Sequence, residues 1–269
     1  MRDERLLRIV FERPWLITSG GHSIVAETIV AHAFRLERAP GVGMCGETVP
    51  VAQMEINGPQ AIIPIKGVIG KGLGAMERGW GATDIEDVAN DFRQASADDS
   101  IEEIFLWIDS PGGVASGVFE FADELAASRK PVTAICDGDM CSAAYLVACA
   151  AESIVITPTA TVGSIGVYMP FMDRTEEFAA MGRKVDLVTS GKYKGAGYPG
   201  TALTLEQRAN FQAQCDQLAE MFKVKVENHR FVSRDSMHGQ TFIGREALRV
   251  GLVDEVVNNI RQKLLSKQG

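Results

Sequence analysis

The chain of 269 residues lacks the features that direct a protein to a membrane, a metal or a nucleic acid. Its longest wholly apolar run, residues 143–151, is far shorter than the roughly 20 residues of a membrane-spanning helix. The five cysteines form no CxxC pair and show no metal-ligand spacing. The formal net charge is −8 without a basic cluster, which argues against nucleic-acid binding. These absences predict a soluble, cytoplasmic protein with no membrane span, no metal and no cofactor.

Histidine, the most frequent general base of enzymes, is also scarce, with four residues in the chain. His22 and His32 lie near the N-terminus, His229 follows a predicted long helix, and His238 lies in a polar segment. None belongs to the strands and turns that would surround a site at the ends of parallel strands. A Ser-His-Asp triad therefore stays open but has no support from the pattern.

Two regions differ in composition. Residues 1–50 are predicted to form an N-terminal helical arm and a linker, and residues 51–269 a single main domain. The arm has apolar residues at helical spacing over 22–37, and the linker, 38–50, is rich in Pro and Gly. The apolar stripe of the arm predicts a partner surface on the main domain or on a neighbouring subunit.

The main domain alternates apolar strand-like segments with amphipathic helical segments. Strands are predicted over 61–69, 102–109, 130–136, 153–157, 164–171 and 184–190. Helices are predicted over 83–98, 114–128, 142–151 and 173–182, and a long helix begins at Thr204, which forms a capping box with Gln207. This order predicts an α/β fold with right-handed crossovers and a mostly parallel sheet.

A glycine-rich turn, DSPGG at residues 109–113, follows a predicted buried strand and precedes a helix. Exposed backbone N–H groups at the positive end of a helix can bind a phosphate or an oxyanion. The alternative is a tight turn in which glycine only relieves strain. The pattern is neither GxGxxG nor a P-loop, so a nucleotide site is weakly supported.

A lone serine, Ser142, interrupts the small apolar run DMCSAAYLVAC at residues 139–149. It has two interpretations, the N-cap of a buried helix or a nucleophile. A nucleophile needs a base, and Lys192 or Lys194 in the following glycine-rich turn provides an amine that can serve if desolvated. The alternative for each is a solvated surface lysine. Ser164, between two glycines, either orients such an amine or bonds its own backbone.

Six segments, taken together and in order, resemble the signal peptide peptidase A family of serine peptidases over roughly residues 60–257. They are DSPGG, CDGDMCSAAYLVACAAESIV, TVGSIGV, SGKYKGAGYP, TLEQRANFQAQCDQLAEMF and GQTFIGREALRVGLVDEV. The resemblance implies the Clp protease/crotonase-like fold of stacked ββα units with a mostly parallel sheet. It also implies catalysis by a Ser-Lys dyad.

Carried onto this chain, the resemblance makes Ser142 the nucleophile and Lys194 the general base. The Lys194 amine is then expected within about 3.5 Å of the Ser142 hydroxyl. Ser164 corresponds to the serine that helps to hold the lysine. Gly113 and Ala143 correspond to the residues whose backbone N–H groups form the oxyanion hole.

The N-terminal ERPWLIT, residues 12–18, and the lack of a membrane span resemble the phage branch of the family, the prohead or capsid assembly proteases. The resemblance implies a polypeptide substrate, such as a capsid or scaffold protein, and a closed homo-oligomer. The glycine-rich loop 67–82 and the N-terminal helix, neither with an obvious intrachain partner, also favour an oligomer. The substrate is expected to be extended, with a small or apolar residue before the cut, and Val114, Met140 and Tyr145 are predicted pocket walls.

Three other functions remain open. A cellular peptidase of the same family would degrade peptides, and a crotonase-type acyl-CoA enzyme would share the fold and an oxyanion hole without the Ser-Lys pair. A catalytically inactive assembly protein would cleave nothing.

Overall fold

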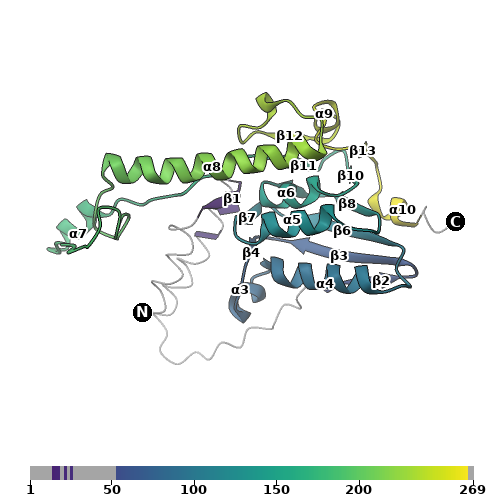
Figure 1. The fold of residues 1–269 in the computed structure, drawn as a ribbon, viewed down its shortest axis with the longest axis horizontal. Helices are drawn as coiled ribbons and strands as arrows, with labels where there is room; N and C mark the ends of the chain where they lie inside the picture. The colour runs from purple at the N-terminus through teal and green to yellow at the C-terminus, as the bar shows by residue number, and fades with distance from the viewer. Residues whose placement is uncertain (1–13, 19–20, 23–24, 27–52, 266–269) are drawn as a thin grey trace.

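The computed structural model describes residues 14–18, 21–22, 25–26 and 53–265 (Figure 1). The largest sheet has six strands in the order β13-β10-β8-β6-β3-β2, and all its neighbours pair in parallel except β2 and β3. In chain order these strands are β2 (Glu55–Asn57), β3 (Gln60–Lys66), β6 (Glu103–Asp109), β8 (Val132–Cys136), β10 (Ser153–Ile156) and β13 (Glu255–Val256). The predicted α/β fold with a mostly parallel sheet is confirmed.

Both faces of this sheet are covered, as the nearly continuous apolar sequences of its central strands require. One face packs in the main core against α4 (Ile85–Ala97), α5 (Val118–Ala126) and α6 (Ala143–Cys149). The opposite face packs against α10 (Ile260–Leu265). The predicted helices over 83–98, 114–128 and 142–151 are therefore confirmed, as are the four central strands.

Two smaller sheets stand beside the large one. The first has the order β1-β7-β4-β5 and the second the order β12-β11-β9. Their strands are β1 (Trp15–Ile17), β4 (Ile69–Gly70), β5 (Thr83–Asp84), β7 (Gly112–Val114), β9 (Asp139–Cys141), β11 (Thr161–Gly163) and β12 (Thr241–Ile243). Each of β3, β6 and β8 is thus followed by a short strand and then a helix, which confirms the stacked ββα units.

The glycine-rich loop, residues 67–82, does have an intrachain partner, contrary to the prediction. It contains a short helix, α3 (Ala75–Gly79), and is bound to the start of α4. The buried carboxylate of Asp84 accepts hydrogen bonds from the backbone N–H groups of Gly72 and Leu73 and from the guanidinium of Arg78. Because charge-assisted bonds to a buried carboxylate are strong, this loop belongs to the body of the molecule.

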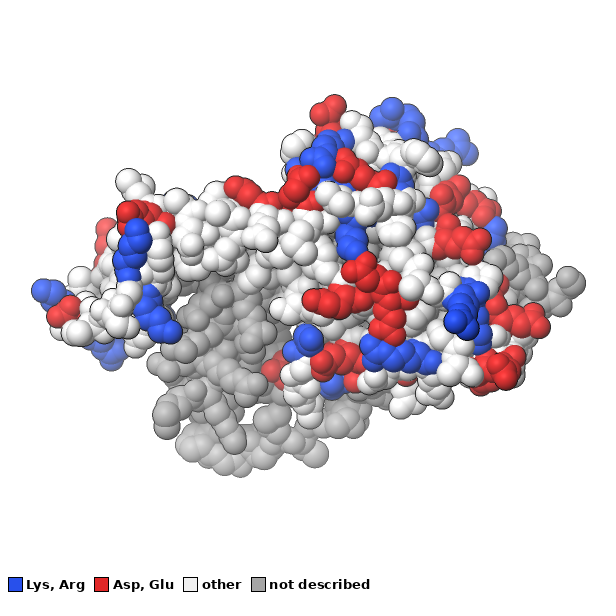
Figure 2. Space-filling model, in the orientation of Figure 1, with Lys and Arg blue, Asp and Glu red and all other residues white. Residues whose placement is uncertain are grey.

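Residues 166–221, here called the extension, contain no buried residue. They comprise α7 (Thr175–Ala180), an irregular segment, and most of α8 (Leu205–His229), which begins with the predicted capping box. Figure 1 shows them projecting from the body, with α7 at the far tip. Figure 2 shows charged side chains over the body and at that tip, with a largely uncharged stretch along α8 between them.

Two strand predictions, 164–171 and 184–190, are wrong. Both segments contain apolar and β-branched residues, but no strand in the described part of the chain pairs with them, apart from one isolated bridge between Tyr168 and Trp15. The predicted helix over 22–37 lies mostly outside the described residues. The C-terminal part adds a short 3-10 turn, Arg234–Ser236, and α9 (Gly244–Arg249).

Candidate active site

Ser142 occupies the sharp turn between β9 and α6. Its backbone has φ 54° and ψ −114°, a strained conformation for a residue with a side chain. The residue is at the N-cap position, but its side chain makes no capping hydrogen bond. It is 1% exposed, and its Oγ has no hydrogen-bond partner among the residues that the structure describes. A strained serine at a strand-to-helix turn is the arrangement by which nucleophile elbows present a hydroxyl.

The backbone around this turn is fixed from three sides. The Ser142 N–H donates to the Gly163 carbonyl at 2.8 Å, and the Ser142 carbonyl accepts from the Leu146 N–H at 2.8 Å. The preceding residue, Cys141, donates to the Ser110 carbonyl at 3.1 Å. Strain at Ser142 is therefore maintained by neighbours that are all buried in the main domain.

Ser164 lies beside Ser142. Cys141 and Gly163 are partners in the parallel pairing of β9 with β11, so the two serines follow paired residues at the same sheet end. Ser164 also has a positive φ, 52°, and is 8% exposed. The structure brings these two predicted site residues together, and the role of Ser164 in holding an amine stays a prediction.

The two glycines of DSPGG are required by close backbone contacts. A Cβ on Gly113 would lie 1.9 Å from the Ile69 carbonyl oxygen. A Cβ on Gly112, whose φ is 108°, would lie 2.2 Å from the Leu16 carbonyl oxygen and 3.0 Å from that of Cys141. Gly112 therefore lies between the backbone of β1 and the backbone of Cys141, where a side chain has no room. Tight packing is one reason for these glycines, and an oxyanion hole from Gly113 and Ala143, the first residue of α6, stays a prediction.

Gly113→Ala is expected to lower both stability and activity. The added methyl group must displace the backbone of β4, so we expect a loss of about 2–3 kcal/mol in the free energy of unfolding, measured by urea titration. Gly79→Ala is the control, because its Cβ would meet nothing within 4 Å. Equal unfolding midpoints for the two variants would contradict the close packing of β4 on β7.

Asp109, the first residue of DSPGG, has a positioning role that the sequence did not reveal. Its Oδ1 accepts a hydrogen bond from the Asp139 N–H at 3.1 Å. A Cβ on Gly138 would lie 2.2 Å from the same oxygen. The carboxylate therefore fixes the start of β9, the strand that ends at Ser142. An aspartate at the end of a predicted strand, three residues before the first glycine of DSPGG, was the available signal.

Lys194 does not reach Ser142 within this chain. It is exposed in the irregular segment of the extension, and Figure 1 shows the extension leading away from α6 along α8. Since Ser142 Oγ has no hydrogen-bond partner, the expected contact of about 3.5 Å between the two side chains is absent from a single chain. The assignment of Lys194 as the base stays a prediction.

Lys192, the rival base, is held in an ion pair. Its Nζ lies 3.3 Å from a Glu206 carboxylate oxygen. Hydrogen bonding with Tyr193, and then with Glu206, raises the pKa of Lys192. A raised pKa leaves a smaller fraction of the Lys192 amine neutral at a given pH, so less of it is available as a general base.

Among the described residues, the histidines and cysteines that we compared offer no better reactive group. His22 stacks edge-on against the rings of Trp15 and Tyr168, at 5.2 and 5.6 Å between centroids. Burial lowers the pKa of His229, at the end of α8. Burial also raises the pKa of the Cys141 thiol to about 12. The cysteine beside Ser142 therefore stays protonated and is a weak nucleophile.

The predicted pocket walls are only partly available. Met140 and Tyr145 are fully buried in the main core, and the Tyr145 hydroxyl donates to the Leu252 carbonyl at 2.8 Å. Val114 instead packs against Trp15 and Ile17 of β1.

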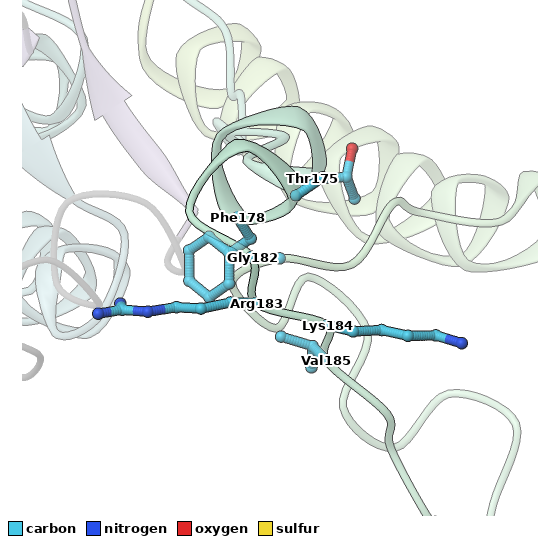
Figure 3. Close-up of a pocket in the computed structure, with 8 residues that line it drawn as sticks. Thr175, Phe178, Gly182, Arg183, Lys184 and Val185 are labelled. Atoms are coloured by element: carbon cyan, nitrogen blue, oxygen red, sulfur yellow. The ribbon is translucent and has the colours of Figure 1, made fainter.

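A cavity of about 460 Å³ lies elsewhere, in the extension. Figure 3 shows Phe178 and Val185 beside it, with the side chains of Arg183 and Lys184 pointing in opposite directions. It is remote from Ser142 and gathers no convergent charges. Within the described part of the chain, no group of three or more His, Cys, Asp or Glu side chains is placed to hold a metal ion, and no helix is long and apolar enough to cross a bilayer.

Comparisons with known proteins agree with the resemblance seen in the sequence. Residues 124–266, more than half of the chain, match the model of peptidase family S49, and residues 80–162 match that of Clp protease. Head-tail preconnector protein GP5 of Enterobacteria phage P21 is 34% identical, covering 80% of this chain and 44% of its own length. Capsid assembly protease C of Escherichia phage lambda is 32% identical, covering 74% of this chain and 46% of its own length.

Solved structures are more distant. ClpP1 from Listeria monocytogenes, in a variant form, has a TM-score of 0.49 at 15% identity and covers 74% of this chain and 92% of that one. The stomatin-specific membrane protease 1510-N of Pyrococcus horikoshii has a TM-score of 0.39 at 19% identity, with 77% of each chain covered. The present chain spans about half the length of the curated relatives that it matches. From the family match, the chain belongs to peptidase family S49.

Proposed function

We propose that this chain is a serine endopeptidase that trims capsid or scaffold polypeptides during the assembly of a phage head. The observation that carries the proposal is the strained Ser142, which lies near the glycines of DSPGG. Its buried hydroxyl has no hydrogen-bond partner among the described residues. The phage assignment is supported by the two relatives described as a head-tail preconnector protein and a capsid assembly protease.

The reaction proposed is acyl transfer by a Ser-Lys dyad. Ser142 Oγ attacks the scissile carbonyl carbon while its proton passes to the neutral Lys194 amine. The backbone N–H groups of Gly113 and Ala143 stabilise the oxyanion of the tetrahedral intermediate. The C–N bond breaks as the leaving amine takes the proton from Lys194, and water then hydrolyses the acyl ester with the same amine as base. Ser164 orients the lysine.

The lysine is proposed to come from a second copy of the chain. The extension that carries Lys194 has no buried residue of its own, so it leaves many of its apolar side chains uncovered. Eight large apolar residues of the extension are exposed: Met172, Met181, Leu187, Val188, Tyr193, Tyr198, Leu205 and Met221. A neighbouring subunit that covers them would bury apolar area and would also bring Lys194 toward a Ser142 not its own.

Two experiments separate this function from its rivals. We expect the purified chain to cut unfolded casein, and also the capsid or scaffold protein encoded with it, with the new ends mapped by mass spectrometry. Cuts should follow small or apolar residues and disappear in Ser142→Ala. No cleavage of either substrate would favour an inactive assembly protein or an acyl-CoA enzyme. Cleavage of casein alone would favour a general peptidase.

A further inference from the structure

A short N-terminal strand, β1, forms backbone hydrogen bonds along both of its edges. It pairs antiparallel with β7, with Trp15 opposite Val114 and Leu16 opposite Gly113. On its other edge, the Trp15 N–H donates to the Tyr168 carbonyl at 2.9 Å, and the Tyr168 N–H donates back at 3.2 Å. β1 therefore fills the edge of the strand that contains the candidate oxyanion glycine.

The register directs a β1 carbonyl at that glycine. The Thr18 N–H donates to the Pro111 carbonyl at 3.0 Å, and the Ala115 N–H donates to the Pro14 carbonyl at 3.4 Å. Hydrogen-bonded pairs recur every second residue in an antiparallel ladder. Leu16 and Gly113, midway between these two bonds, therefore form such a pair, and the Leu16 carbonyl faces the Gly113 N–H.

The side chains of β1 alternate between two apolar environments, as a strand requires. Leu16 is fully buried in the main core, in the same cluster as Ala143 and Tyr145 of α6. Trp15 and Ile17 pack on the other face in a cluster with Val114. The segment is thus held by both its backbone and its side chains.

We infer that β1 is a built-in occupant of the peptide-binding groove, and that an extended polypeptide substrate binds β7 by displacing it, with an apolar residue in the place of Leu16. The inference rests on the proposed function for the identity of the groove. Peptides commonly bind by adding a strand to an exposed sheet edge, and here the chain supplies that strand itself. The 1% exposure of Ser142 fits a groove closed in this way.

The first test locks β1 in place. Trp15 and Val114 are partners in the ladder, next to a hydrogen-bonded pair, so their Cα atoms lie at about the 4.5 Å of a non-hydrogen-bonded pair, within the range of a disulfide. We expect oxidised Trp15→Cys/Val114→Cys to react with a fluorophosphonate at Ser142 at least about tenfold more slowly than after reduction, since only open molecules react. Each single variant is a control. An oxidised protein, with its cross-link verified by mass, that reacts as fast as the reduced one would overturn the inference.

The second test loosens β1. Trp15→Ala/Ile17→Ala is expected to react about tenfold faster than the wild type, and a peptide of residues 13–20, RPWLITSG, should slow it again while a scrambled peptide does not. Phe92→Ala is the matched control, since it removes an equally buried ring from α4. Equal reaction rates in Trp15→Ala/Ile17→Ala and Phe92→Ala, with both proteins folded by circular dichroism, would refute displacement of β1.

Binding of the fluorescent peptide RPWLITSG separates this inference from the proposed function. Binding to the loosened variant but not to the locked one, without any reaction at Ser142, would support the groove and reject the serine peptidase. Reaction at Ser142 at one rate in the locked, loosened and wild-type proteins would do the reverse.

Discussion

Ser142→Ala is expected to abolish peptide hydrolysis, with a loss of about 10⁴- to 10⁶-fold in kcat. The loss follows from removing the nucleophile, because the adjacent residues of the turn, Cys141 and Ala143, carry no hydroxyl that could replace it. Stability should be unchanged or slightly higher, since the deleted Oγ is buried without a hydrogen-bond partner and such a group costs free energy. Turnover of a fluorogenic peptide and a urea unfolding curve measure the two effects.

Ser142→Gly sharpens the same test. Glycine adopts φ 54° without strain, so this variant should be inactive and more stable than wild type by about 1 kcal/mol. Ser164→Ala is the neighbouring control, expected to retain part of the activity. More than a tenth of wild-type turnover in Ser142→Ala would rule out Ser142 as the nucleophile.

Lys194→Ala is expected to be as inactive as Ser142→Ala, whereas Lys192→Ala, which removes only an exposed ion pair with Glu206, should keep most of the activity. Two inactive variants should then rescue each other. If the base comes from a neighbouring copy, co-expressed Ser142→Ala and Lys194→Ala chains that assemble at random should recover about a quarter of wild-type activity. The measurement is turnover by the purified mixed oligomer.

Each contrary result has a distinct meaning. No recovery from mixed oligomers that are shown by mass to contain both chains would place the base within one chain, and the extension would then have to fold back. Loss of activity in Lys192→Ala with retention in Lys194→Ala would reverse the assignment of the two lysines.

The sequence predicted the parts of the fold that have strong periodicity. The buried strand Glu103–Asp109 and the capped helix Ile85–Ala97 lie within about one or two residues of their predicted ranges, because long apolar runs and side-chain caps are local signals. The short strands Gly112–Val114 and Asp139–Cys141 were missed. A strand of three residues is too short to show a hydrophobic alternation, and its pairing depends on segments far away in the chain.

The site was predictable in part, for the same reason. Ser142, Ser164 and Gly113 lie in short motifs that the resemblance identifies, and the structure places Gly113 in β7 and Ser164 beside Ser142. Lys194 is different, because its distance from Ser142 depends on where the extension goes. The apolar residues within 184–190 suggested another strand at the sheet, but none of the described strands pairs with this segment. β1 was unpredictable because its partner, β7, was itself missed.

The absence of buried residues in the extension has a kinetic consequence. The extension contacts the body through few residues, such as Val167, Tyr168 and Leu218, and has no core of its own, so its local unfolding requires little free energy. If a second copy covers the extension, a higher protein concentration increases both the order of the extension and the turnover at the site. The total rate then rises faster than linearly with protein concentration. Dilution would then switch the protein off reversibly, and crowding many copies into a small volume would switch it on.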